Sequence, residues 1–265
     1  MHNRIIDSLR PVPGLRVLVT GGASGIGAAI ARAFCETGAR VHVCDVDRVA
    51  LDGLAAETPA ITTSTADASI AKDVDMVFDD VKHSLGGLDV LISNVGIAGP
   101  TGPMEDLRHA DWERTVDVNL NSHFYFARCA IPLLKASGNN PGLITMSSVA
   151  GRLGYALRTP YACTKWALVG LMKSLAIELG PHGVRVNAIL PGTVEGDRMT
   201  GVIGARAAAA GVSVEAMREE YMQKISLRRM VTTDDISAMA LFLCSPAARN
   251  ITGQAISVDG NMEYL

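Results

Sequence analysis

Short apolar runs alternate along the chain with longer amphipathic runs. Residues 15–20 form a β-branched run that ends at two glycines, and residues 88–96 are almost continuously apolar. A continuous apolar run of this length is typical of a strand buried on both faces. The pattern predicts strands at 15–20, 40–46, 60–66, 88–96, 142–151, 185–192 and 254–260, and helices at 25–38, 47–57, 70–85, 111–136, 160–180 and 233–244.

The predicted order is strand–helix–strand throughout, with helical connections of about 10–25 residues, long enough for parallel crossovers. We therefore expect an α/β fold: a doubly wound (Rossmann) parallel sheet with helices on both faces. No linker rich in Pro, Gly or Ser interrupts residues 15–265, which we interpret as one domain after an N-terminal lead-in, residues 1–14. Residues 193–229 are helical but less regular, with a break at Gly211, and are predicted to form a substrate lid.

The composition narrows the class of protein. The 265 residues are 48% hydrophobic and 19% charged, which favours a large core over disorder. The net charge of -3, without a basic run, argues against a nucleic-acid or anionic-membrane surface. The five cysteines lack a CxxC pair and the six histidines lack an HExxH pattern, so we expect no metal site. With no predicted leader or membrane span, these features indicate a cytoplasmic enzyme.

The stretch VLVTGGASGIG joins the first predicted strand to the first predicted helix. In this position Gly21 permits a tight turn, while Gly25 and Gly27 allow backbone and helix to approach a ligand closely. A helix N-terminus favours negative charge, so the stretch predicts a site for a dinucleotide diphosphate.

Asp45 closes the second predicted strand, 18 residues after Gly27. A carboxylate there accepts both ribose hydroxyls of NAD and repels the 2′-phosphate of NADP. Ser24 stands where a basic residue would bind that phosphate, which also favours NAD. Arg48 lies three residues beyond Asp45 and leaves NADP open.

Tyr161 and Lys165 lie four residues apart at the start of a predicted helix, so they share one face. A lysine ammonium beside a tyrosine favours the phenolate, which can exchange a proton with a substrate hydroxyl or carbonyl while hydride moves. Ser148, thirteen residues before Tyr161 at the end of a predicted strand, can hydrogen-bond the same substrate oxygen.

These motifs occur in one order along the chain, and over residues 12–262 the sequence resembles the short-chain dehydrogenases/reductases of about 250 residues. The ordered motifs are TGGASGIG at 20–27, Asp67-Ala68, NVG at 94–96, Asn119 in DVNLN, Ser148, Tyr161-xxx-Lys165 and Pro191-Gly192. The resemblance implies that Asn119, Ser148, Tyr161 and Lys165 are the catalytic set, with Asn119 holding a proton-relay water near the lysine.

The resemblance also assigns cofactor contacts. Asp67 faces the adenine amine, Asn94 and Gly96 line the adenosine ribose, Tyr161 and Lys165 hold the nicotinamide ribose, and Val194 touches the carboxamide. The full predicted set is Gly21, Ser24, Gly25, Ile26, Gly27, Asp45, Val46, Asp67, Ala68, Asn94, Val95, Gly96, Tyr161, Lys165, Pro191, Gly192 and Val194. The family's threonine four residues after the PG glycine is absent, and Thr193 is a candidate substitute. A homotetramer is implied, with the helices at 111–136 and 160–180 pairing between subunits.

Arginines recur in the segments expected to contact substrate. Arg152, Arg158 and Arg198 are the candidates, alongside Ser148 and Tyr161, and Arg206 lies further along the lid. Guanidinium groups bind carboxylates, sulfonates and phosphates, so the substrate is interpreted as an anionic alcohol, such as a carboxylate, a sulfonate or a sugar acid. Surface or subunit-contact roles for these arginines remain the alternative.

The sequence therefore predicts an NAD-dependent oxidoreductase that interconverts a small-molecule secondary alcohol and its ketone, with Tyr161 as general acid and base. Three alternatives remain open: an NADP(H)-dependent carbonyl or 3-oxoacyl reductase, an epimerase that retains its cofactor, and a non-catalytic NAD-binding regulator.

Overall fold

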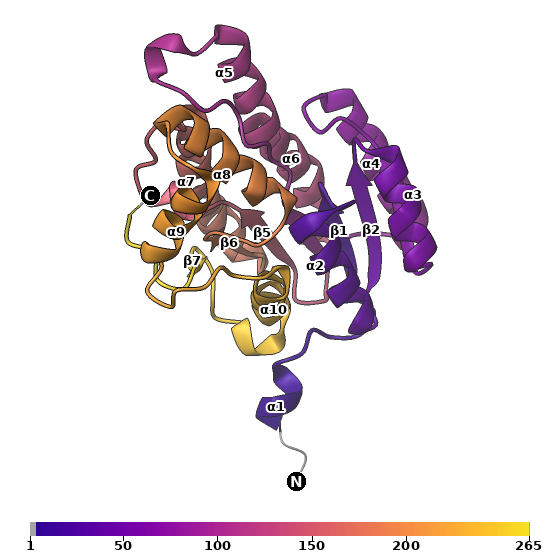
Figure 1. The fold of residues 1–265 in the computed structure, drawn as a ribbon. Coiled ribbons are helices and arrows are strands. Elements are labelled where there is room, and N and C mark those ends of the chain that lie inside the picture. Colours follow the sequence, from indigo (N-terminus) through magenta and orange to yellow (C-terminus); the bar gives the residue numbers. More distant parts are fainter. Residues whose placement is uncertain (1–3, 265) are drawn as a thin grey trace.

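The computed structural model describes residues 4–264, whose centre is a seven-stranded parallel sheet in the order β3-β2-β1-β4-β5-β6-β7 (Figure 1). β1 and β4 are neighbours in the sheet. From β1 the next strands in the chain, β2 and β3, continue toward one edge, and from β4 the later strands, β5 to β7, continue toward the other edge. In such sheets ligands bind beyond the carboxyl ends of the strands, at this switch point. The strands are β1 (Arg16–Thr20), β2 (Arg40–Asp45), β3 (Ile61–Thr65), β4 (Val90–Ser93), β5 (Gly142–Met146), β6 (Arg185–Pro191) and β7 (Ala255–Val258).

Successive side chains of each central strand enter opposite layers of the core. In β1, Val17 and Val19 pack into one apolar layer and Leu18 into the other, and all three are fully buried. The first layer is completed by α2 (Gly25–Glu36), α3 (Arg48–Glu57) and α10 (Thr233–Cys244). The second is completed by α4 (Ala71–Leu85), α6 (Ser122–Lys135) and α7 (Thr159–Leu179). The predicted doubly wound α/β class is therefore confirmed.

Three local differences from the predicted elements are present, and the first two concern the site. The predicted strands 88–96 and 142–151 end early, at Ser93 and Met146, which leaves both following segments free as loops. The predicted helix 111–136 is divided into α5 (His109–Val116) and α6 by a π-helical turn, Asp117–Asn121. Such turns are rare inside helices and are often found at functional sites. A short helix, α1 (Arg4–Ser8), precedes the PVPG stretch, where none was predicted.

Two helices, α8 (Asp197–Ala210) and α9 (Val214–Gln223), lie within residues 193–229, the segment that the sequence predicts to be a lid, as Figure 1 shows in orange. Gly211 separates them with φ +66°, a conformation that glycine adopts without strain. Their own small core contains Ile203, Met217 and Tyr221. None of the helices within residues 4–264 has the length and apolar character required to cross a membrane.

Candidate active site and cofactor cleft

A cavity of about 520 Å³ lies beyond the carboxyl ends of the strands, between them and α8. One end is formed by the loop after β1 and by the ends of β2 and β3. The other end is formed by the loop after β5, the start of α7 and the lid segment. The cavity therefore spans the switch point of the sheet, where both ends of a dinucleotide can be contacted.

The glycine loop leaves backbone open to this cavity. Gly21 and Gly25 have φ values of +59° and +52°, and a Cβ atom on Gly25 would point into open space. A Cβ atom on Gly27 would lie only 2.3 Å from the Gly21 carbonyl oxygen, so the first turn of α2 can pack here only without a side chain. This bare cradle at a helix N-terminus fits a diphosphate.

The loop after β4 is fastened to the glycine loop by Asn94. Its side-chain nitrogen donates to the Gly21 carbonyl at 2.8 Å, and its backbone N–H donates to Thr20 Oγ1 at 3.0 Å. The sequence resemblance assigned Asn94 to the adenosine ribose. In the structure Asn94 lines the cavity, and its amide group also fixes the two loops to each other.

Asp45 lies at the end of β2 and lines the cavity. Its Oδ2 accepts a hydrogen bond from the Ala23 N–H at 3.0 Å, and its Oδ1 accepts one from the Asp47 N–H at 3.1 Å. The carboxylate is thus oriented toward the glycine loop. Arg48 pairs with Asp52 at 3.0 Å on the exposed face of α3 and does not line the cavity.

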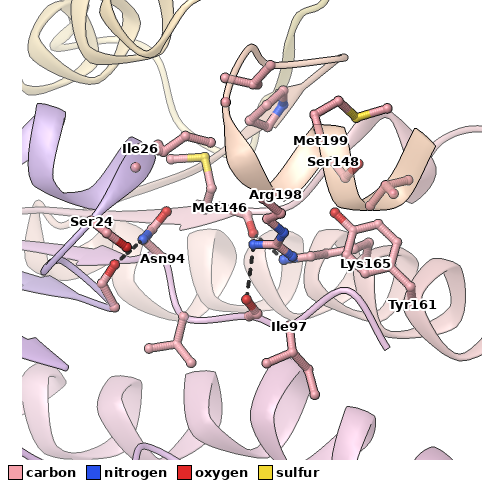
Figure 2. A pocket seen from close by; sticks show the side chains of 18 of the residues that line it. Ser24, Ile26, Asn94, Ile97, Met146, Ser148, Tyr161, Lys165, Arg198 and Met199 are labelled. Carbon is pink, nitrogen blue, oxygen red and sulfur yellow. Dashed lines mark hydrogen bonds between the residues drawn. The ribbon is translucent and has the colours of Figure 1, made fainter. Parts of the chain in front are cut away.

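The opposite end of the cavity brings Ser148, Tyr161 and Lys165 together (Figure 2). Ser148 follows β5, and the other two come from the first turns of α7. The Lys165 ammonium nitrogen is 5.7 Å from the centre of the Tyr161 ring. Ser148 Oγ accepts a hydrogen bond from the Ala150 N–H at 3.2 Å, which fixes the hydroxyl at this end.

Lys165 is a buried cation with a single protein acceptor among the described residues. Its Nζ donates to the Met146 carbonyl at 2.8 Å, and its residue is 3% exposed. Burial, and secondarily the nearby Arg198 guanidinium, lower the pKa of Lys165 from its ordinary value of 10.5 to about 7. The ammonium is therefore easily discharged unless negative charge or hydroxyl acceptors surround it.

Asn119 lies in the π-helical turn and does not itself line the cavity. Its Oδ1 accepts from the Ile97 N–H at 2.7 Å, and its Nδ2 donates to the Ile97 carbonyl at 3.0 Å. Asn119 thus holds the loop after β4 from behind, beside Lys165. Gly96 in that loop packs tightly, since a Cβ atom there would come within 3.3 Å of both Asn119 Oδ1 and Lys165 Nζ and would require them to shift.

The comparisons with known proteins agree with this arrangement. A family model described as enoyl-(acyl carrier protein) reductase matches residues 21–263. Galactitol 2-dehydrogenase of Agrobacterium fabrum is 33% identical over 244 residues, which cover 92% of this chain and 95% of that protein.

The chain belongs to the short-chain dehydrogenase/reductase family.

Two solved structures extend the comparison. A 7α-hydroxysteroid dehydrogenase complexed with NADH and 7-oxo glycochenodeoxycholic acid is 31% identical, with a TM-score of 0.87, and the match covers 99% of this chain and 98% of that one. An NAD⁺-bound xylitol dehydrogenase superposes with a TM-score of 0.90 at 23% identity over 94% and 99% of the two chains, which supports the fold. As a short-chain dehydrogenase/reductase, the chain is an oxidoreductase that acts on alcohol and carbonyl groups.

Within this short-chain dehydrogenase/reductase site, nearly all of the predicted cofactor residues line the cavity. Gly27 is the exception, because it packs against the backbone of its own loop. The lining residues of the predicted cofactor set are Gly21, Ser24, Gly25, Ile26, Asp45, Val46, Asp67, Ala68, Asn94, Val95, Gly96, Tyr161, Lys165, Pro191, Gly192 and Val194.

The three candidate arginines have different positions. Arg152 is turned away from the cavity, where it pairs with Asp259 at 2.9 Å and donates to the Met262 carbonyl at 2.6 Å, so its predicted substrate contact is not supported. Arg158 is 2% exposed and lines the cavity at the Tyr161 end. Arg198 lines the cavity midway, donating to the Gly96 carbonyl at 3.0 Å.

Two tyrosines that the sequence did not single out also line the cavity. Tyr155 and Tyr221, from the loop before α7 and from α9, both line the cavity, and their hydroxyl oxygens are 2.5 Å apart. Arg206 from α8 donates to the Tyr221 hydroxyl at 3.2 Å. Tyr155 falls within the segment expected to contact substrate, but no spacing signal connects it to Tyr221, 66 residues away.

The burial of Lys165 predicts a stability gain when its charge is removed. Because the folded-state pKa is lower than the unfolded one, the charged lysine destabilises the fold at neutral pH, and this cost disappears as the pH rises toward 10.5. Lys165→Met should therefore unfold with a free energy about 1–3 kcal/mol higher than the wild type at pH 7, with a smaller difference at pH 9.5. Urea denaturation at both pH values measures it. A difference that does not change with pH would contradict the argument.

Proposed function

We propose that this enzyme oxidises a secondary alcohol to a ketone, or reduces the ketone, with NAD(H) as its cofactor. The observation that supports this most directly is that Ser148, Tyr161 and Lys165 share one cavity with Asp45, at its opposite ends. A bound nicotinamide supplies the chemistry of accepting or donating a hydride. The chain's own residues bind the two reactants and move the proton.

The proton path starts at Tyr161. In the oxidation, the Tyr161 phenolate oxygen takes the proton of the substrate hydroxyl as the carbinol C–H bond releases its hydride, and the C–O bond becomes a carbonyl. Ser148 Oγ donates a hydrogen bond to the same oxygen. The Lys165 ammonium stabilises the phenolate. In the reduction, Tyr161 returns the proton to the carbonyl oxygen.

The preference for NAD over NADP is supported by the carboxylate at the end of β2. Asp45 is held by two backbone N–H groups and faces the cavity, where a 2′-phosphate would meet its negative charge. Arg48, the residue that leaves NADP open, is paired with Asp52 on the surface. That exposed pair is weak, so Arg48 remains available to a cofactor phosphate once Asp45 is removed.

The proposed substrate carries an anionic group, and Arg158 is the residue that supports this. It is 2% exposed, the only hydrogen bond of its side chain among the described residues is to the Ala98 carbonyl at 2.7 Å, and its Nε is buried without a partner. Its guanidinium carbon is 5.1 Å from the centre of the Tyr161 ring. A buried guanidinium without a carboxylate is costly, and a substrate carboxylate or sulfonate would offset that cost.

Backbone strain directly before Arg158 also supports a functional role for this residue. Leu157 has φ +62°, a conformation that costs a non-glycine residue about 1–3 kcal/mol, and it directly precedes Arg158. The name of galactitol 2-dehydrogenase supports a neutral polyol as the second candidate substrate. A polyol leaves the charge of Arg158 unpaired, and for this reason we favour the acid.

The remaining proposals concern the whole molecule. We propose that residues 15–265 form one domain whose residues 193–229 act as the lid, and that the chain forms a homotetramer in the cytoplasm. Exposed apolar side chains on α6 and α7, Phe124, Trp166 and Ile177, support an assembly through these helices. Five free cysteines suit a reducing compartment.

Tyr161→Phe tests the catalytic assignment. The substitution keeps the ring and removes its only titrating atom, so turnover should fall by about 10²–10⁴-fold while NAD⁺ binding persists. Initial rates at the nicotinamide absorbance measure it, with Tyr125→Phe, outside the cavity, as the matched control. A Tyr161→Phe enzyme within a few-fold of wild type would overturn the proposal. Any turnover by the wild type excludes a non-catalytic regulator, and release of NADH excludes an epimerase.

Asp45→Ala tests the cofactor proposal. The wild type should have the higher kcat/KM with NAD⁺, and the substitution should reduce the ratio of NAD⁺ to NADP⁺ activity by about 10–100-fold, because one repulsive charge is lost and two ribose hydrogen bonds go with it. Steady-state rates with each cofactor give the ratio. A wild type that prefers NADP⁺ would show that the enzyme is instead an NADP(H)-dependent reductase.

Arg158→Met tests the anionic substrate. With 3-hydroxybutyrate the variant should lose about 10–100-fold in kcat/KM, the effect of one charge-assisted ion pair, and with neutral butan-2-ol it should change little. Arg158→Lys should recover part of the loss. Equal losses with the acid and the neutral alcohol would show that Arg158 is structural, held to Ala98 for the sake of its loop.

A further inference from the structure

Arg198 has an unusual place at the start of the lid. It is the second residue of α8, directly after Gly196 and Asp197. A cation in the first turn of a helix faces the positive end of the helix dipole, an unfavourable position that the neighbouring Asp197 in the same turn offsets only in part. In Figure 2 the guanidinium extends from α8 into the middle of the cavity, between Ser24, Ile26 and Asn94 on one side and Ser148 and Tyr161 on the other.

The guanidinium has hydrogen-bonding capacity to spare. Its single hydrogen bond within residues 4–264 goes to the Gly96 carbonyl, so four of its five N–H donors face no protein acceptor. The ion pairs formed between residues 4 and 264 include neither Arg198 nor Lys165. Two cations thus line the cavity without an ion pair to any carboxylate of the described residues, an arrangement that a bound anion would stabilise.

The residues around Arg198 indicate which kind of anion it would bind. Gly96 belongs to the same loop as Asn94, whose amide is bonded to the glycine loop at Gly21. Arg198 therefore faces the part of the cavity that holds the cofactor. The substrate end has its own unpaired guanidinium in Arg158, which lies against Tyr155 and Tyr161.

Gly196, two residues before Arg198, departs from the family pattern at the start of α8. Its φ of +138° and ψ of 177° are values that residues with a side chain rarely adopt, and Gly196 is the position at which the family resemblance places a threonine. The chain has therefore lost that hydroxyl donor, and the glycine turn starts α8 with Arg198 directed into the cavity. Thr193, the other candidate, lines the cavity but is 4% exposed.

We propose that Arg198 binds the diphosphate of the dinucleotide cofactor, supplying from the lid the hydrogen bonds that the missing threonine does not. The inference rests on the proposed use of NAD(H). Cofactor binding would then exchange the Gly96 carbonyl for phosphate oxygens and bring the start of α8 onto the cofactor. Arg198 is in this reading a cofactor-binding residue, in contrast to the substrate role expected from the sequence.

Calorimetric titrations without substrate test this directly. Arg198→Met should raise the Kd for NAD⁺ and for ADP-ribose by about 10–100-fold, because a charge-assisted phosphate contact is lost, and Arg198→Lys should recover part of it. Adenosine, which lacks phosphate, should compete with NADH fluorescence equally well in wild type and variant. Arg218→Met, on α9, is the control because it removes one exposed positive charge from the same lid segment.

Each other outcome overturns the inference. An ADP-ribose Kd that stays within about two-fold of wild type in Arg198→Met would show that the guanidinium does not bind the diphosphate. Tighter binding in the variant would show that Arg198 obstructs the cavity. A similar loss in Arg218→Met would show that only the general charge of the lid matters. A wild type that binds no NAD⁺ would instead overturn the proposed function.

Discussion

A lysine ammonium buried under the end of β5 is the constraint on which the active site depends. Lys165 Nζ is held by the Met146 carbonyl, and the Lys165 carbonyl in turn accepts a hydrogen bond from Ser147 Oγ at 2.7 Å. Gly151 makes this packing possible, since its Cβ would lie 2.4 Å from Ser147 Oγ. These contacts join α7 to β5 and so fix Tyr161 relative to Ser148. Burying this cation lowers the stability of the fold, and the proposed role of Lys165 at the reacting groups would explain why the chain keeps it.

The loop after β4 connects that cation to the cofactor cradle. Asn119 contacts this loop from the π-helical turn. The wider turn shifts the Asn119 side chain out of the regular helical register. From that position it holds Ile97 by two hydrogen bonds, while Asn94 holds the glycine loop. The cavity walls on both sides of the switch point are therefore tied by side-chain amides.

The sequence predicted those parts of the molecule that local patterns determine. Short, almost continuous apolar runs predicted the strands of the sheet. Asp45, Tyr161 and Lys165, which the sequence singled out by their spacing, all line the cavity at the carboxyl edge, where parallel strands and their loops meet. Local sequence patterns could not predict in which direction the side chains of the loops point. Arg152 and Arg158 are six residues apart in one loop, yet one meets Asp259 near the C-terminus and the other enters the cavity. The same holds for Tyr221, whose partner is distant in the chain.

The separation of the arginines along the cavity has a consequence for specificity. Arg158 and Arg198 carry the same charge and come from different elements: Arg158 is the N-cap residue of α7, and Arg198 is the second residue of α8. Arg158 is preorganised, because burial and the Ala98 contact restrict it before any ligand arrives. Arg198 is exposed, so an ion bound in the cavity would restrict it further. In the proposed roles, the preorganised charge of Arg158 would select the substrate by geometry, whereas the charge of Arg198 would couple the position of α8 to occupation of the cleft.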